Sequence, residues 1–149
     1  MREAIRLAIE SVEKDGGPFG AVIVHDRNIV GRGANCVTAA NDPTAHAEIV
    51  AIRQACANLD TFLLDDCECY ATAEPCPMCL GALYWARIPR VYYGCSSRDA
   101  QDIGFDDTRI YRELCIPIPQ RDIRMHQMLR KEALSAFRLW REKSDKIPY

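Results

Sequence analysis

Two short segments contain the residues best suited to metal chemistry. Cys76 and Cys79 are separated by two residues, so a helix would place their thiols about one turn apart on one face. Such a pair can chelate zinc, form a redox disulfide or lie in an ordinary core. His46 adds a third donor and leaves the fourth tetrahedral position to water, a pattern typical of catalytic zinc. The set predicts one zinc ion per chain, bound by His46, Cys76 and Cys79.

Glu48 follows the candidate histidine by two residues. Inside a helix, residues two apart point about 200° away from each other, so they converge only on a site beyond the helix end. Asp42 and Pro43 predict such an end, because an acid followed by proline is typical of a helix start. Zinc lowers the pKa of a bound water to ~7, and a neighbouring carboxylate can carry the proton from that water to a substrate. Glu48 is therefore the candidate catalytic residue.

Hydrophobic periodicity and turn residues predict the elements that position these groups. The pattern predicts helices over 2–14, 44–58, 75–87, 109–114 and 129–143, and strands over 19–24, 29–33, 67–72 and 91–95, with an edge strand over 123–127. A hairpin followed by alternating helices and strands is typical of an α/β fold. We expect one domain over residues 1–149, a three-layer α/β/α sandwich with a mixed sheet of about five strands.

Composition excludes several classes of protein. Apolar residues make up 48% of the 149 residues and charged residues 27%, which is typical of a soluble globular protein and not of a disordered or fibrous chain. No apolar run reaches the ~18 residues of a membrane span, and no signal-peptide pattern opens the chain. The eight cysteines therefore predict free thiols in a reducing, cytoplasmic environment. A net charge of −2 disfavours nucleic acid as a partner.

The two segments together spell H-x-E…P-C-x-x-C, the signature of zinc nucleobase deaminases. The chain resembles the cytidine-deaminase-like superfamily over nearly its whole length, with matches at residues 17–22, 42–48 and 74–79. This resemblance implies hydrolytic deamination, with zinc on His46, Cys76 and Cys79 and with Glu48 as the proton carrier. The non-enzymatic alternative, a structural zinc module, would need a fourth protein ligand and would give Glu48 no role.

Within this superfamily the chain most resembles the bacterial guanine deaminases. The features are residues 81–87, the Gly-Phe-Asp-Asp run at 104–107, Phe137-x-x-Trp140-Arg141 and the final tyrosine. The resemblance implies that the protein converts guanine and water to xanthine and ammonia. It also implies a homodimer whose subunits can exchange the C-terminal helix and tail, about residues 129–149. It also implies a set of purine contacts: Asn35, Asp107, Phe19, Ala47 and Tyr149.

Other interpretations of these residues remain open. Asp106 and Asp107 could belong to a solvated acidic loop, although guanine's N1–H and amino group suit a carboxylate acceptor. Asn35 could cap a turn, and Phe19 and Trp85 could be core aromatics. The stretch 121–146 has eight basic and four acidic residues, which is compatible with a tRNA adenosine deaminase. Guanosine and an aminated triazine such as ammeline are further candidate substrates.

Overall fold

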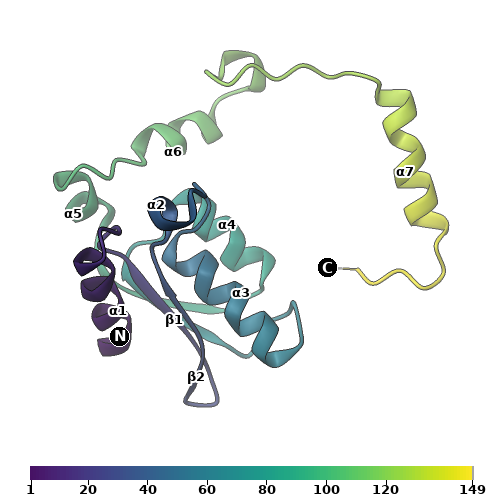
Figure 1. Cartoon of the computed structure of the whole chain (residues 1–149). Helices are drawn as coiled ribbons and strands as arrows, with labels where there is room; N and C mark the ends of the chain where they lie inside the picture. The colour runs from purple at the N-terminus through teal and green to yellow at the C-terminus, as the bar shows by residue number, and fades with distance from the viewer. Residues whose placement is uncertain (149) are drawn as a thin grey trace. The chain divides into compact units, whose positions relative to one another are not determined.

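The computed structural model describes residues 1–148, and the chain divides into two compact units, residues 1–108 and residues from 109 onward (Figure 1). The helices of the first unit are α1 (Arg2–Glu13), α2 (Val37–Ala40), α3 (Ala47–Leu59), α4 (Pro77–Trp85) and α5 (Ser97–Asp102). Its strands are β1 (Gly20–His25), β2 (Asn28–Ala34), β3 (Glu68–Ala73) and β4 (Arg90–Cys95). Helix α6 (Thr108–Cys115) begins at the boundary, and the second unit continues with a short 3₁₀ turn (Ile118–Gln120) and α7 (Arg130–Glu142).

The four strands form one mixed sheet in the order β2-β1-β3-β4. Strand β1 pairs antiparallel with both β2 and β3, whereas β3 and β4 are parallel and are joined through α4. The expected mixed α/β sheet is confirmed. The predicted edge strand over 123–127 is wrong, because that segment has no strand and pairs with no neighbour. Its alternating Ile123 and Met125 side chains are exposed, so alternation alone did not create a buried face.

Helices cover both faces of this sheet. Successive side chains of a strand point to opposite faces, so Gly20 lies against α1 while Gly31 and Gly33 lie against α3. The face covered by α3 and α4 holds the apolar core (Figure 1). The core side chains come from β1, α3, β3 and α4 and from the loop before β3, and they include Ala21, Ile23, Ala51, Ala55, Leu64, Cys67, Cys69, Ala71 and Leu83.

Helix α1 packs through a different face from the one that its large apolar residues predict. Ala4, Ala8 and Ser11 are buried, whereas Ile5, Ile9 and Val12 are exposed in this chain. The reason is close approach: a Cβ at Gly20 would lie 2.1 Å from the Ala4 carbonyl oxygen, so only small side chains fit between α1 and β1. The larger side chains form an apolar stripe that faces away from this sheet.

The second unit has no buried core of its own within its described residues. None of its described residues, 109–148, is buried. The apolar side of α7, which includes Phe137 and Trp140, is exposed in this chain, and so is Leu139. Across residues 1–148, no helix combines the length and apolar character needed to cross a bilayer.

Candidate active site

The start of α3 places the first group of candidate residues. The helix begins at Ala47, three residues later than predicted, and His46 is its N-cap with extended backbone (φ −69°, ψ 155°). Asp42 does not cap this helix; its carboxylate accepts hydrogen bonds from the backbone N–H (2.8 Å) and hydroxyl (2.7 Å) of Thr44. Because His46 lies outside the helix and Glu48 lies in its first turn, the two side chains can reach one site beyond the helix end.

The sheet fixes this helix end closely. A Cβ at Gly33 of β2 would lie 1.9 Å from the carbonyl oxygen of Ala47, so the first turn of α3 rests directly on the strand backbone. After β2, the backbone N–H of Cys36 donates to the carbonyl of Ala45 at 2.9 Å. The end of β2 and the start of α3 are therefore held together on both sides of His46.

Helix α4 begins in the same way. Cys76 is its N-cap with extended backbone (φ −63°, ψ 167°), Pro77 occupies the first helical position, and Cys79 follows within the first turn. Proline suits this position because the missing N–H would have no partner inside the helix. The N-termini of α3 and α4 thus converge, and their partial positive charges favour thiolates and other anions.

The donor atoms of His46, Cys76 and Cys79 form a group that could hold one metal ion. The Nδ1 atom of His46 lies 3.5 Å from the Sγ atom of each cysteine. Zinc ligands at ~2.3 Å (sulfur) and ~2.0 Å (nitrogen) on tetrahedral axes would be about 3.5 Å apart, so the residues present fit zinc. Among residues 1–148 no fourth protein donor joins the group, which is typical of catalytic and not of structural zinc.

Glu48 is buried beside this group without belonging to it. Its side chain is only 8% exposed, and its Oε2 atom lies 3.4 Å from the Sγ atom of Cys79. Burial raises the pKa of the Glu48 carboxyl group above its ordinary value. A carboxylate this close to the donors can exchange a proton with a molecule bound at an open metal position.

The pKa values of the two cysteines shift in opposite directions. Hydrogen bonding from the Cys79 thiol lowers the pKa of Cys76 to about 4, and His46 acts in the same direction. The same bond and burial raise the pKa of Cys79. The hydrogen bond to Cys76 raises the pKa of His46. A thiolate at Cys76 is the protonation state that zinc ligation requires.

The structure separates the two adjacent aspartates of the acidic loop. Asp106 accepts a hydrogen bond from the backbone N–H of Thr108 at 2.9 Å and so supports the start of α6. Asp107 is partly buried, and the pKa of its carboxyl group is raised by burial and then by the negative charge of Cys76. The charge of the metal-donor residue Cys76 therefore acts on Asp107, whereas Asp106 has a local structural role.

The structure describes three of the other four predicted contacts. Asn35 directly follows β2 and is partly buried. Phe19 packs against the core and makes an edge-to-face contact with Phe105 (ring centroids 4.8 Å apart). The side chain of Ala47 is buried in the core, so only its backbone N–H, unpaired within α3, is suited to contacting a ligand. Tyr149 lies outside the described residues.

Two aromatic residues differ from their sequence-based interpretation. Trp85, for which a core position was one interpretation, is 68% exposed in this chain and lies at the end of α4. Phe105 was not predicted as a site residue, yet its contact with Phe19 anchors the loop that carries Asp107. The sequence signal for it was its place in the Gly-Phe-Asp-Asp run, two residues before Asp107.

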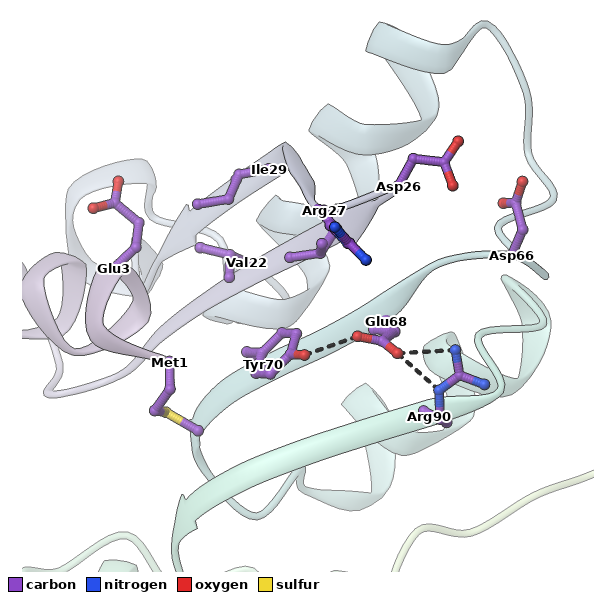
Figure 2. A pocket seen from close by; sticks show the side chains of 11 residues that line it. Met1, Glu3, Val22, Asp26, Arg27, Ile29, Asp66, Glu68, Tyr70 and Arg90 are labelled. Carbon is purple, nitrogen blue, oxygen red and sulfur yellow. Dashed lines mark hydrogen bonds and ion pairs between the residues drawn. The ribbon is translucent and has the colours of Figure 1, made fainter.

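A separate cavity of about 580 Å³ lies on the α1 side of the sheet (Figure 2). Three of its polar residues pair with one another, because Glu68 accepts hydrogen bonds from the Tyr70 hydroxyl (2.8 Å) and from Arg90 Nε (2.9 Å). None of the metal-donor residues lines this cavity. It is therefore distinct from the candidate active site.

Comparison with known proteins agrees with the geometry of the site. The model of the cytidine and deoxycytidylate deaminase zinc-binding region matches residues 1–95. A guanine deaminase of Bacillus subtilis is 50% identical over all of this chain and 96% of its own length. The crystal structure of guanine deaminase from that organism superposes with a TM-score of 0.96 over 99% of this chain and 95% of that one.

Relatives with another named activity match a shorter part. A tRNA-specific adenosine deaminase of Haemophilus influenzae is 41% identical over 76% of this chain and 69% of its own length. The resemblance predicted from H-x-E…P-C-x-x-C is confirmed, and the chain belongs to the cytidine and deoxycytidylate deaminase zinc-binding family.

Proposed function

We propose that this protein is a zinc-dependent guanine deaminase, which converts guanine and water to xanthine and ammonia. The convergence of three metal donors with a buried, non-ligating Glu48 carries the proposal of hydrolytic deamination. The extent of the match supports guanine as the substrate, because similarity to the Bacillus subtilis guanine deaminase covers the whole chain. The tRNA deaminase relative matches only 76% of it.

The residues of the chain have distinct roles in this reaction. His46, Cys76 and Cys79 would hold zinc, which supplies Lewis acidity and lowers the pKa of water to ~7. Glu48 accepts the proton of the attacking water at its carboxylate and delivers it to the ring nitrogen next to the amine-bearing carbon. It then moves a proton to the departing amine, so one water is consumed and one ammonia is released.

Guanine recognition uses groups that match its hydrogen-bonding edges. The carboxylate of Asp107 accepts from guanine N1–H and from the amino group, while the Asn35 carboxamide contacts the opposite edge. The backbone N–H of Ala47 is a further donor, and Phe19 lies against the ring. These assignments are supported for Asn35 and Ala47 by their positions beside and at the start of α3, and for Asp107 by the influence of Cys76 on its pKa.

Assembly and location form part of the same proposal. A homodimer is supported by the exposed apolar stripe of α1 (Ile5, Ile9, Val12) and by the exposed apolar side of α7. We infer that residues 129–149 are exchanged between subunits and that Tyr149 closes the pocket over the bound base. The eight free thiols support a reducing, cytoplasmic environment, and the net charge of −2 supports a small substrate over nucleic acid.

The test is ammonia release with product identification over a panel of substrates. The panel comprises guanine, guanosine, ammeline, adenosine, cytidine and a tRNA anticodon hairpin. We expect xanthine from guanine and a kcat/KM for guanine at least about 100-fold above every other member, because a site built to hydrogen-bond its substrate rejects analogues strongly. Preferred turnover of the hairpin adenosine would instead identify a tRNA deaminase.

A further inference from the structure

Ser11 is a buried polar residue that the proposed chemistry does not use. Among residues 1–148, only Ser11 (6% exposed) and Glu48 combine a polar or charged side chain with full burial. A serine within a helix commonly bonds its own preceding turn or faces water. Ser11 of α1 instead donates its hydroxyl hydrogen to the backbone carbonyl of Asn35, 24 residues away, at 3.1 Å.

This bond is one of three that fix Asn35. The backbone N–H of Asn35 donates to the Phe19 carbonyl at 3.0 Å. The side-chain Oδ1 accepts the Val37 N–H at 3.3 Å. Within residues 1–148 the Nδ2 group of Asn35 donates no hydrogen bond, and because no side-chain nitrogen or oxygen there is both buried and unpartnered, Nδ2 is an accessible donor. The carboxamide is thus held by its oxygen, which leaves its two N–H donors for a ligand.

Gly17 restricts the same side chain from another direction. A Cβ at Gly17 would lie 3.1 Å from Cγ and 3.2 Å from Oδ1 of Asn35, so the glycine backbone packs closely against the carboxamide. On its other side, Cys36 is tied to Ala45, the residue before His46, by a backbone hydrogen bond. The Asn35 amide is therefore fixed beside the start of α3, where the metal donors converge.

We propose that Ser11 is a positioning residue for purine recognition: its hydroxyl fixes the Asn35 carbonyl and thereby directs the Asn35 Nδ2 donors at an acceptor on the purine edge. This inference rests on the proposed function, in which Asn35 binds the base. Loss of the hydroxyl frees the Asn35 peptide, and the carboxamide then samples orientations that do not meet the substrate. The contact is made equally in the bound and transition states, so its loss raises KM more than it lowers kcat.

The test compares Ser11→Ala with a matched control. Ser11→Ala should raise KM for guanine about three- to tenfold, the effect of one neutral hydrogen bond, with kcat within about twofold and zinc content unchanged. The control is Thr38→Val, because the Thr38 hydroxyl also joins the segment after β2 to the loop after α1, donating to Asp15, without touching Asn35. The control should leave KM unchanged. A Ser11→Ala protein that is less stable but keeps its KM would overturn the inference.

A double-mutant cycle separates positioning from other effects. Asn35→Ala should raise KM, and adding Ser11→Ala to it should raise KM no further, because both act through one contact. Additive increases would show that Ser11 acts elsewhere and would overturn the inference. An Asn35→Ala protein with unchanged KM would instead refute the proposed role of Asn35 itself.

A second variant keeps the test valid if Ser11→Ala does not fold. Ser11→Cys fills nearly the same volume with a weaker donor. Positioning predicts a melting temperature close to that of the unmodified protein and a KM for guanine clearly above it. An unchanged KM in this variant would count against the inference.

Discussion

Replacing Glu48 by glutamine removes the proposed proton carrier while preserving the shape of the site. The side chain is buried, and its carboxylate accepts a hydrogen bond from the thiol of Cys79 at 3.4 Å, which the amide oxygen of glutamine can still accept. Glutamine also has no charge to desolvate, so we expect folding stability to change by less than about 1 kcal/mol. Zinc should remain bound, because Glu48 does not belong to the donor group.

Turnover is the quantity that this change should affect. A positioned general acid–base contributes ~10²–10⁴ in rate, so kcat for guanine should fall by that factor, equivalent to about 3–5 kcal/mol of activation free energy. The assay is ammonia release at saturating guanine, with zinc content and melting temperature measured on the same preparation. Glu13→Gln, the same substitution at an exposed position of α1, is the control and should keep full activity.

The role of Glu48 as the proton carrier is refuted if the Glu48→Gln protein, with its zinc in place, turns over guanine within tenfold of the unmodified rate. That result would mean that another group moves the proton. Loss of zinc from Glu48→Gln would also contradict the account, because it would make Glu48 a ligand.

Three further predictions concern the metal donors, the substrate contact and the tail. Cys76→Ser and Cys79→Ser should each lose both zinc and guanine turnover; metal analysis that still finds one zinc per chain would contradict the ligand assignment. Asp107→Ala should lower kcat/KM for guanine about 10- to 100-fold with zinc unchanged, the size of a hydrogen bond to a charged group; equal rates of the unmodified protein on guanine and on a purine without these donors would remove Asp107 from the site. Deleting residues 147–149 should strongly reduce guanine turnover with zinc and fold intact; normal turnover would exclude a catalytic role, and an active monomer would assign the tail to assembly.

The metal donors were predictable because their chemistry is local. His46, Cys76 and Cys79 are few in type and characteristic in spacing, and a tetrahedral ion accepts little else. The start of α3 was harder to place. Asp42 and Pro43 resemble a helix cap, but the Asp42 carboxylate instead closes a turn with Thr44, and the helix begins at Ala47. Both arrangements use the same residue types, and the contact of the first turn of α3 with Gly33 is visible only in the folded chain.

Other features depend on contacts between distant segments. The buried face of α1 is set by how closely Gly20 lets the helix approach β1, so the small residues and not Ile5 and Ile9 face the sheet. By contrast, the difference between Asp106 and Asp107 is local, because it follows from which of the two accepts the backbone N–H of Thr108. Ser11 gave no sequence signal, because its partner Asn35 lies 24 residues away.

Removing and restoring zinc tests directly whether guanine turnover depends on one zinc ion per chain, held by His46, Cys76 and Cys79. The metal is withdrawn with a chelator, and guanine turnover is then measured as zinc is added back in fractions of one equivalent per chain. We expect no guanine turnover without metal. Turnover should then recover linearly and level off at one zinc per chain, because the donor group can hold one ion. Xanthine formation by the zinc-depleted protein, or recovery that needs two zinc ions per chain, would contradict this expectation.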